Sequence, residues 1–176
     1  MTSNDSPRKP AADAAGPTTS DAPCAAFYDG KQYTAGTSVG WMLKRAHNAL
    51  LRSMDTRMQP YDLTAMQWGP LLLIAKGYET VAACAREADI DASAMTRMLD
   101  RLETKGLITR VRSEADRRVV NLALTPAGTE LAKKIPPEMA LVLNHHLRGF
   151  TEEEFETLKT LLRRFERNGE LPMDAT

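Results

Sequence analysis

Two arginines and a carboxylate lie together in a short polar segment of this sequence. Residues 107–128 read LITRVRSEADRRVVNLALTPAG, and Asp116, Arg117 and Arg118 occupy the polar middle. Guanidinium groups on a projecting loop can enter the narrow groove of DNA, where the negative potential is concentrated. The alternative is a solvated turn whose charges only maintain solubility. The choice between these interpretations depends on the secondary-structure elements that position the three side chains.

Residues that favour β-structure flank the polar middle on both sides. They occupy partly alternating positions, as in short strands: Leu107, Ile108 and Val111 before it, and Val119, Val120, Leu122 and Leu124 after it. The pattern predicts a β-hairpin with a basic tip, which is the form of a wing.

A helix–turn–helix pattern precedes this hairpin. Residues 81–88 are small and apolar enough to form a short buried helix. A second helix is predicted to begin after Asp91, with Ser93 as an alternative N-cap, and to end at Lys105 and Gly106. Its apolar residues recur at spacings of three and four and form an inward stripe: Met95, Met98, Leu99 and Leu102.

The opposite face of this second helix has a different character. It carries Ser93, Ala94, Thr96, Arg97, Asp100 and Arg101. Short side chains with interspersed arginines suit a helix that lies in the major groove, whereas a merely solvated face more often carries long Lys and Glu pairs. The order of the elements predicts that this helix reads base edges while the wing contacts the neighbouring DNA backbone.

Three segments carry a family resemblance. Residues 63–68 (LTAMQW), 98–108 (MLDRLETKGLI) and 116–128 (DRRVVNLALTPAG) together resemble the MarR family of bacterial transcription regulators. The resemblance extends over roughly residues 37–168. It implies a mainly α fold with a small β wing, in which N- and C-terminal helices form a dimerisation domain around a winged helix-turn-helix domain.

The resemblance also implies a function. Such regulators are homodimeric repressors whose DNA affinity usually falls when a small, often aromatic, anion binds. Asp116 would brace the wing by pairing with a basic residue, while Arg117 or Arg118 meets DNA. With the outward face of the second helix, the expected DNA-binding residues are Ser93, Thr96, Arg97, Arg101, Arg117 and Arg118. The whole-chain pattern is most similar to regulators of aromatic or N-heteroaromatic acid catabolism, including nicotinate degradation.

The composition is consistent with a DNA-binding regulator but does not by itself predict one. The chain has 176 residues, of which 43% are hydrophobic and 26% charged, as in an ordinary globular domain. Its net charge is zero, and residues 86–118 hold eight Lys or Arg against seven Asp or Glu. Any contact with DNA must therefore depend on where these charges lie. No apolar run has the length of a membrane span or a signal core, so we expect a cytoplasmic protein.

The sequence predicts five segments along the chain. Residues 1–24 form a disordered tail rich in Ala, Pro, Ser, Thr and Asp. Residues 25–62 form an N-terminal dimerisation segment, 63–125 the winged helix-turn-helix domain, 126–168 the C-terminal dimerisation helices, and 169–176 a second tail.

Helix signals support these divisions. A long helix is predicted from Thr37 to about Met58, ended by Pro60, and another from Thr64 to residues 76–77. Thr125 and Pro126 begin a third, which Pro136 and Pro137 should bend or interrupt. The last has a capping box of Thr151 and Glu154, and its apolar face consists of Phe155, Leu158, Leu162 and Phe165.

The first helix and the last two carry more apolar surface than a lone winged helix would need. We expect them to form a homodimer, although packing within one chain is the alternative. A two-fold pair of recognition helices would meet major grooves about 34 Å apart and would favour a pseudo-palindromic operator.

An effector site is predicted beside the first helix. Arg45 and His47 offer donors near Trp68, and a guanidinium with an aromatic wall is what a small aromatic carboxylate needs. The resemblance places a pocket between the dimer helices and the winged domain, with Met42, Met66 and Leu72 as further lining. Trp68 could instead be ordinary core, and Arg45 could pair with Asp55, Asp62 or the other subunit.

The remaining candidate sites are weaker. Cys84 fits a core position, whereas Cys24, followed by Tyr28 and Tyr33, raises the alternative of a thiol-based redox sensor, although no cation lies near it to activate the thiol. His145 and His146 point about 100° apart on a helix and do not predict a metal site.

No catalytic motif is present, so neither an enzyme nor a bound cofactor beyond the effector is expected. A winged-helix module used only for protein association is the main rival, and it would lack a DNA affinity that falls steeply with salt.

Overall fold

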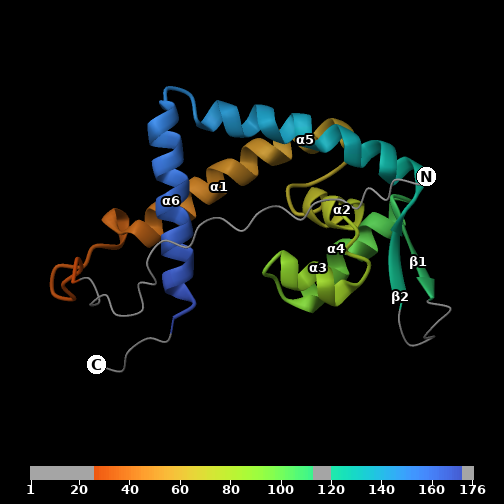
Figure 1. The fold of residues 1–176 in the computed structure, drawn as a ribbon, viewed down its shortest axis with the longest axis horizontal. Helices are drawn as coiled ribbons and strands as arrows, with labels where there is room; N and C mark the ends of the chain where they lie inside the picture. The colour runs from red at the N-terminus through yellow and green to blue at the C-terminus, as the bar shows by residue number, and fades with distance from the viewer. Residues whose placement is uncertain (1–25, 113–119, 172–176) are drawn as a thin grey trace, which may run out of the picture.

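The computed structural model describes residues 26–112 and 120–171, which form helices and a single β-hairpin (Figure 1). The elements in chain order are η2 (Ala35–Thr37), α1 (Val39–Met58), η3 (Gln59–Tyr61), α2 (Trp68–Ala75), α3 (Val81–Glu87), α4 (Ala92–Thr104), β1 (Ile108–Arg112), β2 (Val120–Leu124), α5 (Pro126–His146) and α6 (Glu152–Gly169). Helices α2 to α4 and the hairpin form a winged helix-turn-helix unit. The predicted fold class, mainly α with a small β wing, is confirmed.

Side-chain caps fix where several helices begin. The Asp91 carboxylate accepts hydrogen bonds from the backbone amides of Ser93 and Ala94 and thereby begins α4. Thr125 accepts from the amide of Gly128, with Pro126 in the first turn of α5. Thr151 and Glu154 form both halves of a capping box at α6. These three predicted helix starts are confirmed, because each depends on residues within one turn of sequence.

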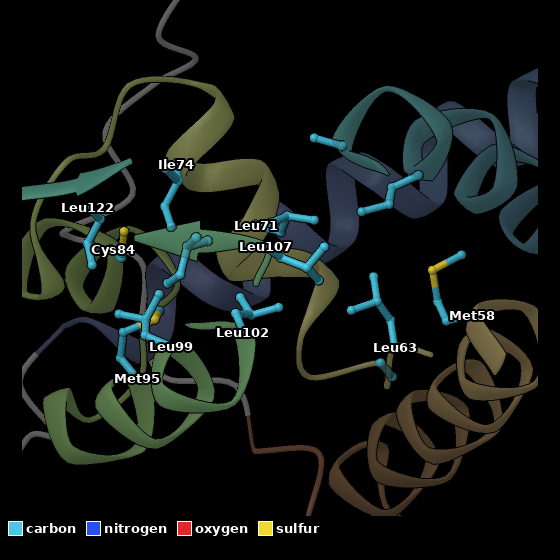
Figure 2. Close-up of a cluster of buried hydrophobic side chains, with 14 of the residues drawn as sticks. Met58, Leu63, Leu71, Ile74, Cys84, Met95, Leu99, Leu102, Leu107 and Leu122 are labelled. Atoms are coloured by element: carbon cyan, nitrogen blue, oxygen red, sulfur yellow. The ribbon is translucent and has the colours of Figure 1, made fainter. Parts of the chain in front are cut away.

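The core of the winged unit lies between α2, α3, α4 and the hairpin (Figure 2). Met95, Leu99 and Leu102 of α4 are fully buried, as the inward stripe predicted. Cys84 is also fully buried, and desolvation raises the pKa of its thiol. It is therefore a core residue, as expected. Cys24 lies outside the described residues.

The hairpin is a two-stranded antiparallel sheet. Its register places Ile108 opposite Leu124 and Arg112 opposite Val120. Ile108 and Leu122 face the core and are buried, whereas Thr109, on the opposite face of β1, is exposed. Val120 shares the face of Leu122 but is exposed at the end of β2. The two predicted strands are confirmed.

One predicted helix boundary is wrong. Helix α2 begins at Trp68 rather than Thr64. Residues 64–67 form a turn, in which the Gln67 amide donates to the Thr64 carbonyl at 2.9 Å and the Gln67 side chain accepts from the Thr64 amide. Pro136 and Pro137 do not interrupt α5, which runs unbroken from Pro126 to His146. Because neither proline has a backbone N–H, the carbonyls of Ala132 and Lys133 lack their usual partners within α5.

Helices α1 and α5 pack against each other, while α6 stands apart from the winged unit (Figure 1). None of the residues of α6 is buried, although its side chains include Leu161, Leu162 and Phe165, each more than two-fifths exposed. The described part of the chain therefore presents a substantial uncovered apolar surface on α6. No helix in it is both long and apolar enough to cross a membrane.

Candidate nucleic-acid interface

The first turn of α4 is held by an acidic cap. The Asp91 carboxylate accepts from the Ser93 hydroxyl as well as from the amides of Ser93 and Ala94, at 2.8 and 3.2 Å. The Ser93 hydroxyl and these amides lower the pKa of Asp91 below its usual value. Ser93, a predicted DNA contact, therefore already serves the cap with its hydroxyl, and its oxygen also lies 3.4 Å from a guanidinium nitrogen of Arg97.

The rest of the outward face of α4 is accessible. Thr96, Arg97 and Arg101 are exposed, and the Thr96 hydroxyl donates to the backbone carbonyl of Ala92 at 2.8 Å. The structure thus brings the four predicted α4 residues onto one solvent-facing surface, opposite the buried stripe. The side chains are short at the start of the helix and cationic further along, which suits entry into a major groove.

An arginine outside the predicted set joins the hairpin to this helix. The Arg110 guanidinium on β1 lies 2.6 Å from Oδ1 of Asp100 and also pairs with the carboxylate of Glu103. Burial alone would lower the pKa of Arg110, but the hydrogen bonds and charges of the two carboxylates raise it above its usual value. Sequence reasoning missed Arg110, although acidic residues three apart on a helix, followed by a basic residue on the next strand, are a usable signal.

A second link joins α4 to the segment after α1. The Lys105 ammonium lies 3.1 Å from the Asp62 carboxylate and 3.3 Å from Oε1 of the buried Gln67. Asp62 adopts a left-handed backbone conformation with φ of 51°. The sequence predicted Lys105 only as a cation at the C-terminus of this helix. In the structure, Lys105 also links that C-terminus to Asp62, four residues after the end of α1.

The predicted wing-tip residues Asp116, Arg117 and Arg118 lie outside the described residues. The described ends of the two strands, Arg112 on β1 and Val120 on β2, lie opposite each other and are exposed.

The residues of the predicted effector site are spread over α1, the turn before α2, and α2. Arg45, His47, Met42 and Met66 are exposed, whereas Trp68 and Leu72 are half-buried against the core. The Trp68 indole nitrogen is buried and has no hydrogen-bond partner among the described residues. Arg45 forms no ion pair there with Asp55 or Asp62, because Asp55 accepts from the Ala65 amide and Asp62 pairs with Lys105.

The larger cavity described in the structure lies elsewhere. It has a volume of about 540 Å³ and lies between α1 and α5, lined by Ser53, Thr56, Arg57, Pro60, Tyr61, Glu138, Leu141, Val142 and His145. A second, of about 440 Å³, is lined by Asp55, Thr56, Gln59, Asp62, Leu63, Thr64 and Lys105. Neither of these two cavities is lined by any of the six predicted effector residues.

Polar contacts join α1 and the following residue Tyr61 to α5 at the larger cavity. Glu138 on α5 accepts a 2.8 Å hydrogen bond from the Tyr61 hydroxyl and pairs with Arg57 on α1. The Tyr61 hydroxyl and Arg57 lower the pKa of Glu138, and the same hydrogen bond raises the pKa of Tyr61. Nearby, His146 lies 2.9 Å from the Ser53 hydroxyl. Within residues 26–112 and 120–171, no three His, Cys, Asp or Glu residues are grouped as a metal site would require.

Comparisons with known proteins agree with this geometry. Residues 78–120 match the model of the MarR family, a segment that contains α3, α4 and β1. The reduced form of MarR from E. coli is 26% identical, with a TM-score of 0.64, over 73% of this chain and 96% of that one.

Two further solved structures have the same fold. A cysteine-to-serine mutant of E. coli MarR complexed with operator DNA is 28% identical, with a TM-score of 0.67, over 72% of this chain and 92% of that one. BpsR of Bordetella bronchiseptica, whose DNA binding is regulated by 6-hydroxynicotinic acid, matches at 23% identity and a TM-score of 0.70 over 82% and 99%. Residues 78–120, which include the exposed helix α4, therefore match the MarR family of DNA-binding transcription regulators, and the described chain has the winged-helix fold of these solved structures.

Proposed function

We propose that this protein is a homodimeric repressor that binds a pseudo-palindromic operator and is released by a small aromatic acid. The observation that carries the DNA-binding part is the exposed face of α4, where Thr96, Arg97 and Arg101 lie opposite a fully buried apolar stripe. A rigid helix with such a face can lie in the major groove while its cations meet bases and phosphates. Arg117 or Arg118 would enter the minor groove, with Asp116 as the brace.

Uncovered apolar side chains support the homodimer. Leu161, Leu162 and Phe165 on α6, Leu141 and Leu143 on α5, and Val39, Trp41 and Met42 on α1 are each more than two-fifths exposed. Large apolar side chains left exposed on three helices favour association with another apolar surface. A two-fold partner that covers it would present a second recognition helix to the same DNA, as a pseudo-palindromic operator requires.

The Trp68 indole supports an effector site near α2. A buried indole N–H normally has an acceptor, because an unpaired buried donor is unfavourable. The indole nitrogen of Trp68 is buried with no partner among the described residues, so the carboxylate of an effector would supply the acceptor. Arg45 and His47 are exposed on α1 and are the proposed cationic partners of that carboxylate. BpsR responds to 6-hydroxynicotinic acid, and we extend that ligand class, hydroxylated pyridine carboxylates, to this chain.

The experiment is a fluorescence titration of the protein with its own upstream promoter DNA at fixed salt. It is repeated with 6-hydroxynicotinic acid and with a panel of hydroxylated benzoates and pyridine carboxylates. The proposal predicts tight binding that one compound weakens, and a loss of that response in Trp68→Phe, which keeps the ring and removes the N–H donor.

The matched control is Arg57→Gln in the cavity between α1 and α5, which should respond as the wild type does. An effector response lost in Arg57→Gln and kept in Trp68→Phe would move the effector site to that cavity. If no compound alters DNA binding, the proposed DNA-binding function stands and the proposed release by an aromatic acid is rejected.

A further inference from the structure

The recognition helix carries no net charge of its own. Between Ala92 and Thr104 its charged residues are Arg97 and Arg101, against Asp100 and Glu103. DNA presents a dense row of phosphates, so carboxylates on a helix in its groove oppose binding. A helix that reads DNA with this composition needs something to offset Asp100 and Glu103.

These two carboxylates lie close to the proposed DNA-contacting arginines. Asp100 is three residues after Arg97 and directly before Arg101, so it lies on the same turn as both. The side chains of Asp100 and Glu103 remain 55% and 38% exposed, so their charge is not hidden by the protein. Burial therefore cannot account for how the helix tolerates them.

Arg110 supplies the missing positive charge. It shares with Ile108 the face of β1 that is turned toward the core, and its side chain is only 25% exposed. One guanidinium nitrogen lies 2.6 Å from Asp100 and the other pairs with Glu103, so a single planar group satisfies two carboxylates one turn apart on α4. A lysine could not do this equally well, because its ammonium is a point charge without the fork of the guanidinium.

We propose that Arg110 is a positioning residue that sets the DNA affinity of this protein by neutralising Asp100 and Glu103, without itself contacting DNA. The inference rests on the proposed function, because it concerns how the same interface meets DNA. Strand β1 would then have a second role besides forming the wing. It carries Arg110, whose positive charge allows α4, a helix with no net charge, to approach the phosphates.

The test is a rescue experiment with operator DNA over a series of salt concentrations. Arg110→Gln should weaken binding roughly tenfold or more, because two carboxylates then face the phosphates unpaired. Adding Asp100→Asn and Glu103→Gln to that variant should restore affinity to within about threefold of the wild type. Arg163→Gln on α6 is a matched change of charge away from the winged unit and should leave the affinity unchanged.

The salt dependence separates this role from a direct contact. An arginine bound to a phosphate would lower the slope of log K against log salt concentration by about one when removed. The proposal predicts the wild-type slope in both Arg110→Gln and the rescued triple variant. If Arg110→Gln does not fold, as judged by circular dichroism, Arg110→Lys keeps one charge without the fork and should weaken binding less than tenfold, and adding Asp100→Asn should restore it. A folded Arg110→Lys that binds as the wild type does, or that Asp100→Asn does not restore, would overturn the role of Arg110.

The possible results distinguish a failure of the proposed function from a failure of the role of Arg110. A wild-type protein that binds no operator rejects the proposed function rather than this inference. Wild-type binding that Arg110→Gln leaves intact, a folded triple variant that stays as weak as Arg110→Gln, or a slope that falls by about one, each overturns the role of Arg110.

Discussion

Gly128 packs directly onto the backbone of Leu107. A β-carbon at residue 128 would lie 1.9 Å from the carbonyl oxygen of Leu107, and the same oxygen accepts a 3.1 Å hydrogen bond from the Thr125 amide. The Thr125 hydroxyl also donates to the carbonyl of Gly106 at 2.7 Å. The first turn of α5 therefore packs tightly against the turn between α4 and β1 and is hydrogen-bonded to it. We call this contact between the end of the recognition helix and the start of α5 the junction.

This junction predicts that Gly128→Ala is strongly destabilising. The contact is with backbone, which cannot rotate away, so the free energy of unfolding should fall by about 3 kcal/mol or more. Gly40→Ala in α1 is the control, because a β-carbon there meets nothing within 4 Å. Urea unfolding of the two variants should separate them clearly, and similar midpoints would show that the junction is not tight.

Glu138 should make the stability of the protein depend on pH. Its pKa lies below the ordinary 4.5 because the Tyr61 hydroxyl and Arg57 favour its charged form. Its contribution to stability is therefore present above pH 4.5 and lost as the pH falls through the lowered pKa. Glu138→Gln should be less stable than the wild type at pH 7, and the difference should shrink toward pH 3 in urea titrations. A difference that stays constant with pH would contradict this assignment.

The apolar face of α6 predicts that a charge there produces monomers. Phe165 is 55% exposed in the single chain, so Phe165→Glu should leave the monomer folded but place a carboxylate in the proposed dimer interface. Analytical ultracentrifugation should find monomers, with DNA affinity lost along with the dimer. Thr160→Glu, on the other side of the same helix, should remain dimeric. A dimeric Phe165→Glu would place the interface elsewhere.

Arg97 offers a test of base reading. If its guanidinium contacts a base edge, Arg97→Ala should cost about 1 to 3 kcal/mol of binding free energy and relax the preference at one base step. A phosphate contact would instead weaken all sequences alike. Titration of the variant with operator DNA substituted at single positions distinguishes the two, and an unchanged affinity would remove Arg97 from the interface.

Short-range patterns made much of the fold predictable from sequence. The caps at Asp91, Thr125 and Thr151 and the buried stripe of α4 all depend on residues within one or two turns, which sequence displays directly. The predicted start of α2 is wrong, because residues 64–67 form a separate turn whose Gln67-to-Thr64 contact resembles one half of a capping box, so the local signal does not separate a turn from a helix start.

Long-range partners were not predictable in the same way. Tyr61 and Glu138 are 77 residues apart, and the cavity that they line exists only because α1 and α5 pack together. The Lys105 link to Asp62 and Gln67 depends on the same tertiary arrangement. The predicted DNA-binding residues of α4 lie on one exposed surface, as their helical spacing predicted, while their contacts with DNA and the roles of Arg45, His47 and Trp68 stay predictions.

The central claim, that α4 and the wing bind operator DNA, is tested most directly by a salt titration. Binding of the wild-type protein to its own upstream promoter is measured against an unrelated duplex of equal length from low to physiological salt. The account predicts specific binding whose log K falls linearly and steeply with log salt concentration. Binding that does not distinguish the two duplexes, or no binding even at low salt, would contradict it.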